Sequence, residues 1–208
     1  MTRLHKNTLW GLAACVGILV SLQLSLQLQA AEQVKWNQEK LKSILLTEVA
    51  RLGRVASNEV LVNAVAKQNA EKLTLETITA RDKTWTTTDS SDSFKQAMLA
   101  SEAGTFLQNL ISSTGSYTEA FITDNQGANV ATYPLTSDYW QGDEDKFIKA
   151  FSGKTGNVYI GNMEWDESSQ FNAVQISVPV LENGDAIGVM VVGVKLSHVL
   201  AKQLEELL

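Results

Sequence analysis

Adjacent aromatic side chains in the second half of the chain have the composition of a small-ligand site. Tyr139 and Trp140 stand side by side in a polar stretch, and Tyr159 brings a phenolic hydroxyl group further along. Small-ligand sites combine apolar and aromatic walls with a few well-placed polar groups. We therefore predict that Tyr139 and Trp140 wall a binding site and that Tyr159 offers its hydroxyl from a strand. The alternative is that these aromatic side chains only fill the core.

Polar residues on an otherwise apolar strand add directional chemistry to this prediction. Gln175 and Ser177 alternate with Val174, Ile176 and Val178, so they share one face of a strand. Such side chains can form hydrogen bonds with a carboxylate or an amide. Asp124 and Asp143 are candidates to pair with an amine, and Tyr133 is a further candidate ligand-binding residue. The alternative for the polar face is simple solvation. Trp165, in an acidic segment, is a weaker candidate.

The elements that must position these residues begin with a hairpin. Phe121–Asp124 and Asn129–Tyr133 are short β-type runs around the turn signal Asn125-Gln126-Gly127, and Pro134 ends the second run. An aromatic-rich loop then leads into a short amphipathic helix over 143–151. Acidic residues at that boundary suit a helix N-terminus.

Helical periodicity dominates the chain before the hairpin. Apolar residues recur at helical spacing over 32–54 and over 94–111. Between these segments, Ser57 or Asn58 is a candidate cap for a further helix. The 73–88 segment is mixed, with Asp82 and Trp85 placed to fix a loop. The N-terminal helices are interpreted as packing helices, with a dimerisation helix as the alternative.

Strand patterns dominate the chain after the hairpin. We predict strands near 157–161, 171–180 and 186–196, with a strong turn signal at 182–185 and a terminal helix over 197–208. The predicted fold class is α+β: an antiparallel sheet of about five strands, with long N-terminal helices and a short C-terminal helix. Residues 31–112 form the helical part and 117–196 the sheet part of one domain covering 31–208.

Residues 1–30 have the pattern of an export signal. A basic start precedes an apolar run from Leu9 to Leu22, and Ala30 ends a small-residue cleavage site. Two alternatives compete with cleavage there. Leu12-Ala13-Ala14-Cys15 resembles a lipoprotein box, and Thr8–Leu28 is long enough for an uncleaved anchor. In each case the remaining chain is expected outside the cytoplasm, in the periplasm.

Charge and composition argue against several function classes. The 208 residues carry a formal charge of −6 and contain no basic run, which argues against nucleic-acid binding. Beyond the leader there is no cysteine and one histidine, His198, so nucleophile–base pairs and histidine zinc sites lack ligands. Asp143, Glu144 and Asp145 match no calcium loop and are better explained as a helix start. We expect no enzyme activity, no cofactor and no metal.

Several motifs together resemble the single Cache family of PAS-like extracytoplasmic sensor domains. The resemblance covers roughly Val34 to Leu200, and its order and spacing are more specific than any one motif. It rests on the following stretches: Phe121-Ile122-Thr123-Asp124-x-x-Gly127; Ser137 to Glu144; Val158 to Gly161; Gln175 to Val180; Asn183-Gly184-x-x-Ile187-Gly188-Val189; Asn63-Ala64-Val65; Gln68-Asn69; and Asp82-x-x-Trp85.

This resemblance implies a non-catalytic small-molecule sensor. Members bind amino acids, carboxylates or similar metabolites between the sheet and the loop and helix that cross it. Most are the outer half of a chemoreceptor, kinase or cyclase. This chain departs from that pattern, because twelve residues follow Leu196. We therefore expect a binding subunit that passes its ligand state to a membrane receptor or kinase, with a homodimer through the N-terminal helix as a further expectation. The competing hypothesis is a ligand-free structural module of the same fold.

Overall fold

The computed structural model describes residues 27, 29, 39–166, 171–197, 199 and 201. The chain divides into two compact units, Met1–Leu46 and Thr47–Leu208. Within the described part of the first unit, residues 39–46 are helical. Most of the predicted export signal and most of the predicted C-terminal helix, including His198, lie outside the described residues. No described helix combines the length and the apolar character needed to cross a membrane.

The second unit begins with helices and continues as a sheet. Residues 47–56 are helical, and four helices follow: α2 (Glu59–Ala70), α3 (Leu75–Thr87), α4 (Ser93–Ala100) and α5 (Glu102–Thr114). Next come β1 (Tyr117–Thr123), β2 (Asn129–Tyr133), α6 (Asp145–Phe151) and a 3-10 turn η1 (Ser152–Lys154). The strands β3 (Tyr159–Asp166), β4 (Phe171–Glu182) and β5 (Asp185–Lys195) complete the described elements.

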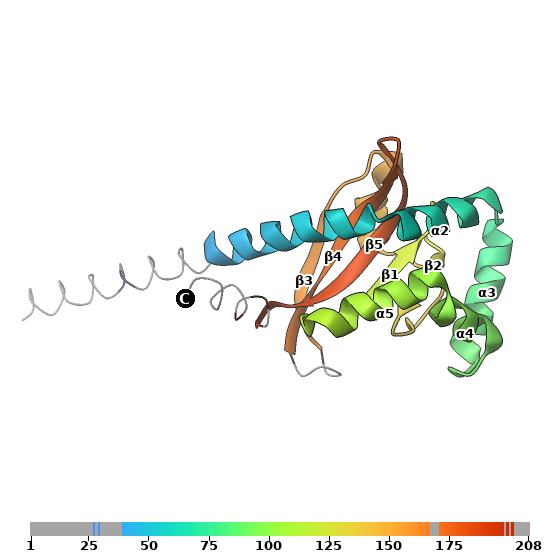
Figure 1. Ribbon diagram of the computed structural model, residues 1–208, viewed down its shortest axis with the longest axis horizontal. Helices are drawn as coiled ribbons and strands as arrows, with labels where there is room; N and C mark the ends of the chain where they lie inside the picture. Colours follow the sequence, from blue (N-terminus) through green and yellow to red (C-terminus); the bar gives the residue numbers. More distant parts are fainter. Residues whose placement is uncertain are drawn as a thin grey trace, which may run out of the picture. The chain divides into compact units, whose positions relative to one another are not determined.

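The five strands form one antiparallel sheet in the order β2-β1-β5-β4-β3. The predicted α+β class, with a sheet of about five strands after long helices, is therefore confirmed. Figure 1 shows α2 and α5 across one face of the sheet, with α3 and α4 beside the β2 edge. α6 contacts β3, β4 and β5 and packs against the other face.

Local capping explains where the helices begin. The Asn58 side chain accepts a hydrogen bond from the amide of Val60, as predicted for the start of α2. The predicted single helix over 94–111 is instead two helices, because Ser101 ends α4 and caps α5 through the amide of Gly104. Gly104 is required at this junction, since a Cβ there would collide with the Met98 carbonyl oxygen.

A bulge near the start of β1 sends neighbouring side chains to opposite faces. Tyr117 pairs with Val194, whereas Glu119 pairs with Gly193, and the register shifts between them. Tyr117 is buried on the helix side, where its hydroxyl donates to a carboxylate oxygen of buried Glu48 at 2.9 Å. Glu119 points to the α6 side. One strand therefore contributes to both layers of the fold within three residues.

Candidate functional site

The sheet face under α6 combines an apolar centre with polar ends. Phe147 and Ala150 of α6 pack on Phe121, Val189 and Val191. Register then assigns further residues to this face, because side chains of paired residues point to the same side. Phe121 and Ser177 pair with Val191, and Tyr159 pairs with Ser177. Ser177 is therefore a fully buried polar residue in a mostly apolar row.

The next row of paired residues across the strands contains two polar side chains with a glycine between them. Glu119 of β1 and Gln175 of β4 both pair with Gly193 of β5. Because Gly193 has no side chain, the two polar residues meet above it, and Gln175 Nε2 donates to Glu119 Oε1 at 2.8 Å. A Cβ at Gly193 would lie 3.0 Å from Glu119 Cγ and would collide with the Thr118 hydroxyl. The hydrogen bond between Glu119 and Gln175 therefore requires a glycine at position 193.

The loop between β2 and α6 supplies amide groups whose orientation is fixed. Gln141 is 1% exposed, and its Nε2 donates to Asp138 Oδ1 at 2.6 Å. Asn129 is fully buried, and its Nδ2 donates to Thr136 Oγ1 and to the Asp138 carbonyl oxygen. Within the described part of the chain, no partner reaches Gln141 Oε1, Asn129 Oδ1 or Ser177 Oγ.

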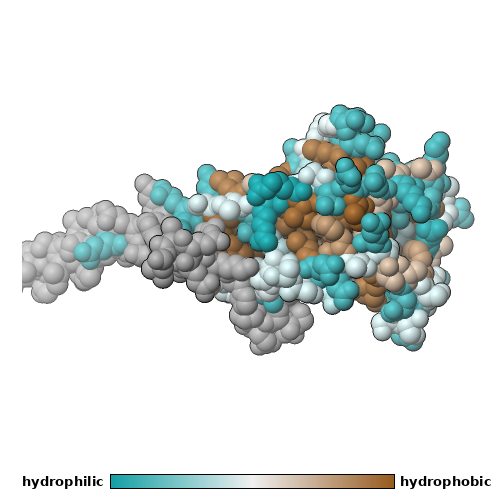
Figure 2. All heavy atoms as spheres, viewed as in Figure 1, coloured by the Kyte–Doolittle hydropathy of each residue, from teal (hydrophilic) through white to brown (hydrophobic). Residues whose placement is uncertain are grey.

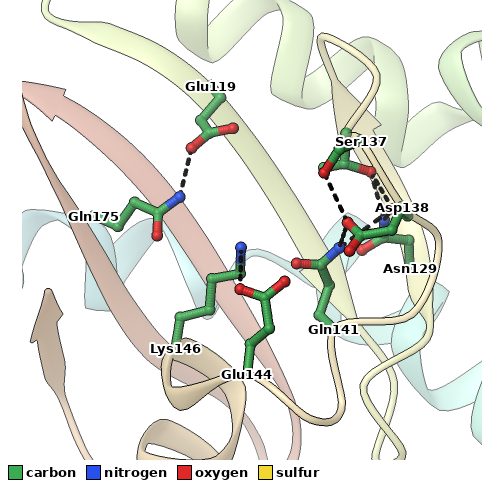
Figure 3. A network of polar contacts seen from close by, with 9 residues as sticks. Glu119, Asn129, Ser137, Asp138, Gln141, Glu144, Lys146 and Gln175 are labelled. Carbon is green, nitrogen blue, oxygen red and sulfur yellow. Dashed lines mark hydrogen bonds and ion pairs between the residues drawn. The ribbon is translucent and has the colours of Figure 1, made fainter. Parts of the chain in front are cut away.

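Charged groups complete the cluster. Lys146 Nζ lies 2.9 Å from Glu144 Oε2 and 5.4 Å from the centroid of the Phe121 ring. Its side chain is only 15% exposed. Figure 3 shows side chains from β1, β4, α6 and the preceding loop pointing toward one another: Glu119, Gln175, Lys146, Glu144 and Gln141. We call these five residues, together with Ser177 and Asp138, the α6-face cluster.

The predicted aromatic pair lies elsewhere, in a packed core beside α3 and α4. Tyr139 is fully buried among Ile78, Trp85, Met98 and Ala128. Its ring centroid is 6.0 Å from that of Trp85. Burial raises the pKa of the Tyr139 phenol, and the neighbouring Arg81 guanidinium partly opposes this increase. Tyr139 therefore packs the core, which is the alternative that the sequence left open.

Hydrogen bonds from α3 hold the loop that carries this aromatic pair. Asp82 Oδ1 accepts from the amides of Tyr139 and Trp140 at 2.8 and 3.0 Å. Trp85 Nε1 donates to the Thr136 carbonyl oxygen at 2.9 Å. Trp140 Nε1 donates to the carbonyl oxygen of Gln126 in the β1–β2 turn. Asp82 and Trp85 thus fix the 134–141 loop, which is distant from them in sequence, in place of the loop that follows them.

The remaining predicted residues divide between the cluster and other places. Gln175 and Ser177 belong to the α6-face cluster, and Tyr159 shares their sheet face, with Lys149 Nζ 4.9 Å from its ring centroid. Asp124 is instead buried in the β1–β2 turn, where its carboxylate accepts from Gln126 N, Ala128 N and Gln68 Nε2.

The last two predicted residues also lie away from the cluster. Tyr133 pairs with Ala120 and so points to the helix side of the sheet, opposite Phe121. Asp143 is exposed just before α6. Trp165 lies in β3, and its side chain is outside the described part of the structure.

Five cluster residues were not predicted as site residues from the sequence: Glu119, Asp138, Gln141, Glu144 and Lys146. A signal existed for Glu119, because it alternates with Phe121 and so shares its face. Gln141 lies inside the stretch that carries the family resemblance. Lys146 had no distinguishing signal, since an amphipathic helix start explains it equally well.

A hollow lies on the surface between the end of α2 and the β1–β2 turn. Its volume is about 320 Å³, and it is lined by polar side chains, including Gln68, Asn69, Lys72 and Asn125. Several of these groups already bond one another or the backbone, as Asn69 does with the Ile187 carbonyl and the Asn125 amide. Among the described residues, no group of three or more His, Cys, Asp or Glu side chains is arranged to hold a metal.

Comparison with solved structures found similarity to sensor and ligand-binding domains. It is 12% identical to the sensor domain of the Vibrio cholerae histidine kinase DctB, with a TM-score of 0.43, covering 77% of this chain and 54% of that one. It is 13% identical to the ligand-binding domain of the Pseudomonas aeruginosa amino acid chemoreceptor PctC in complex with GABA, with a TM-score of 0.38, covering 74% and 63%.

A third similar structure is the Campylobacter jejuni chemoreceptor Tlp3 sensory domain with isoleucine bound. It is 14% identical, with a TM-score of 0.37, and the match covers 79% of this chain and 66% of that one. The chain spans just over half of the DctB domain and less than two thirds of the PctC domain. No family model and no curated protein matches the sequence. The three solved structures are a sensor domain, a ligand-binding domain and a sensory domain, respectively.

Proposed function

We propose that this protein is an exported, non-catalytic sensor domain that binds a small molecule at the α6-face cluster. The observation that supports the proposal most directly is the set of buried polar atoms without partners. Gln141 Oε1 and Ser177 Oγ are almost completely inaccessible and unbonded in the described structure. Leaving a buried polar group unpaired costs about 1–3 kcal/mol. A ligand that bonds these atoms would remove that cost.

The proposed ligand is an amino acid or a small carboxylate, and the proposed partner is a membrane receptor or kinase. Glu119 and Lys146 offer both signs of charge within one cluster. The proposed location is the periplasm, with residues 1–30 as a cleaved leader or a retained anchor. Dimerisation through the N-terminal helix is part of the same proposal.

The test begins with the full chain as it is purified from cells. The protein is denatured, and the small molecules it releases are identified by mass spectrometry. The stripped protein is refolded and its melting temperature is measured with each candidate. A ligand at one hundred times its Kd stabilises the native state by about 2.7 kcal/mol. For a chain of this length that increase corresponds to about 5–11 °C in Tm.

A structural or interaction module is the second candidate function. Two observations favour it: the space beneath Tyr139 is filled by packed side chains, and Figure 2 shows hydrophobic residues gathered in the middle of the viewed face with hydrophilic residues around them. This candidate predicts no released small molecule, no ligand-dependent change in Tm, and a concentration-dependent oligomer in light scattering. Finding a released metabolite that restores the original Tm would contradict it.

A further inference from the structure

We infer that the α6-face cluster recognises an ammonium group, so that its ligand is a small amine or amino acid and a carboxylate without an amine does not bind. This inference rests on the proposed function and specifies the ligand class for the same site. Three features support it: the charge of the cluster, the fixed orientation of its amides, and the engagement of its single cation.

The cluster carries more negative than positive charge. Glu119, Asp138 and Glu144 contribute three carboxylates, and Lys146 contributes one ammonium, which gives a formal charge of −2. A simple carboxylate would add a further negative charge, and like charges at close range repel one another. A cationic group lowers the local imbalance. Charge alone therefore favours an amine.

The orientation of the buried amide groups also favours an amine, independently of the charge. Gln141 Nε2 faces the Asp138 carboxylate at 2.6 Å, and only the nitrogen end of the amide can donate to a carboxylate. The atom left without a partner must be Oε1, which is an acceptor. Asn129, which is outside the cluster but bonded to its residue Asp138, follows the same rule, because its Nδ2 donates to the Asp138 carbonyl oxygen and its Oδ1 stays unbonded.

The unmet hydrogen bonds of this region are therefore mainly acceptors. Ser177 adds a hydroxyl group that can also accept. An ammonium group supplies three donors and no acceptor, whereas a carboxylate supplies only acceptors. Gln141 is the decisive residue, since it is almost fully buried and Figure 3 shows it directed toward Glu144 and Lys146.

Lys146 does not already supply the missing donor. Its Nζ is paired with Glu144, and Gln141 Oε1 remains without a partner among the described residues. A lysine ammonium has three donors, so Lys146 can share its charge between Glu144 and the carboxylate of a zwitterionic ligand. Amino acids should therefore bind at least as well as the corresponding amines. A divalent cation is disfavoured, because the lysine ammonium occupies the same small group of carboxylates.

The test uses matched triplets of compounds with the stripped and refolded full chain. Each triplet is an L-amino acid, the amine left when its carboxyl group is removed, and the carboxylate left when its amino group is removed. For leucine these are L-leucine, 3-methylbutan-1-amine and 4-methylpentanoate. Thermal shift is measured for each at neutral pH, and calcium chloride is a separate arm. At least one triplet should show a shift of several degrees for its amino acid or amine and none for its carboxylate.

Variants then connect the shift to the cluster. Glu119→Gln preserves the size of the side chain and removes one negative charge. It should therefore reduce the affinity for the best amine or amino acid at least tenfold, as measured by calorimetry. Glu182→Gln makes the same charge change at an exposed position in the β4–β5 turn and should alter affinity less than twofold. The Tm of each variant without ligand shows whether it is folded.

The outcomes separate the two proposals. Stabilisation by carboxylates without amines, or equally by all three members, overturns the inference but leaves the sensor proposal standing. Stabilisation by calcium chloride alone overturns the inference as well. If no compound stabilises the protein, the inference fails, and the mass spectrum of released molecules then decides the proposed function separately. Unchanged affinity in Glu119→Gln also overturns the inference.

Discussion

The buried hydroxyl of Ser177 should lower the free energy of unfolding of the ligand-free protein. Its Oγ is fully inaccessible and has no hydrogen-bond partner in the described structure. Replacing Ser177 by Ala removes the unpaired group and keeps the Cβ on the α6 face of the sheet. The removed desolvation cost is about 1–3 kcal/mol, reduced by the small void that the lost oxygen leaves. We expect Ser177→Ala to raise the free energy of unfolding of ligand-free protein by about 0.5–2 kcal/mol.

Ser116 provides a matched control for this substitution. It is also buried, at 1% exposure, but its hydroxyl donates to the Thr114 carbonyl oxygen at 3.3 Å. Ser116→Ala should lower the free energy of unfolding by about 0.5–1.5 kcal/mol, because it removes a formed hydrogen bond. The two substitutions delete the same atom from buried sites and should therefore act in opposite directions.

The assay is urea denaturation of the stripped and refolded protein, with and without the best ligand. Ser177→Ala should increase the midpoint without ligand and reduce the gain that ligand provides. If Ser177→Ala destabilises the ligand-free protein as much as Ser116→Ala does, the Ser177 hydroxyl already has a partner in that state. That result would refute the reasoning from unpaired atoms, on which the proposed site depends.

Other substitutions test the remaining contacts. Gly193→Ala should abolish ligand binding and lower the Tm, because the new methyl group would lie 3.0 Å from Glu119 Cγ; normal binding calorimetry would contradict the geometry. Tyr117→Phe leaves buried Glu48 without its donor and should cost about 1.5–3 kcal/mol, measurable in urea; a cost below 0.5 kcal/mol would show that the bond contributes little. Tyr139→Ala should cost about 3–5 kcal/mol, because it empties a packed core site; a native-like Tm would disprove that packing.

Alkaline pH offers a prediction that needs no substitution. Burial is the main cause that raises the pKa of both Tyr117 and Tyr139. Unfolded tyrosine loses its proton near pH 10, whereas the native state retains both protons to higher pH. Their contribution is therefore complete below pH 10 and is lost as pH rises toward the native pKa values. The free energy of unfolding should fall by up to about 1.4 kcal/mol per pH unit for each tyrosine, and Tyr117→Phe should roughly halve that slope.

Much of the fold could be predicted from the sequence, because it depends on local patterns that are also present in the structure. Alternation in the 171–180 run predicted which residues share a face, and pairing confirms that Gln175 and Ser177 lie together. The turn residues Asn183 and Gly184 have positive φ, as their type suggests. The 94–111 helix was predicted without its break, because Ser101 has a helix-compatible neighbourhood and its capping bond depends on the contact between α4 and α5.

The site was less predictable because its residues come from separate elements. Periodicity assigns Gln175 to a face but does not show that Gly193 allows Glu119 to reach it from two strands away. Tyr139 and Trp140 attract attention by their size, yet large aromatic side chains are as useful in a core as in a pocket. Which use applies here depends on α3 and α4, whose contacts with the loop span about fifty residues of sequence.

The bulge at the start of β1 has a mechanical consequence. Tyr117 is bonded to the helical segment on one side of the sheet, and Glu119 reaches the α6-face cluster on the other. Only one residue separates these two attachments. A displacement of the Glu119 backbone must therefore rotate or shift the Tyr117 phenol against Glu48. Two peptide groups of β1 therefore connect the helical layer directly to the α6-face cluster through the sheet.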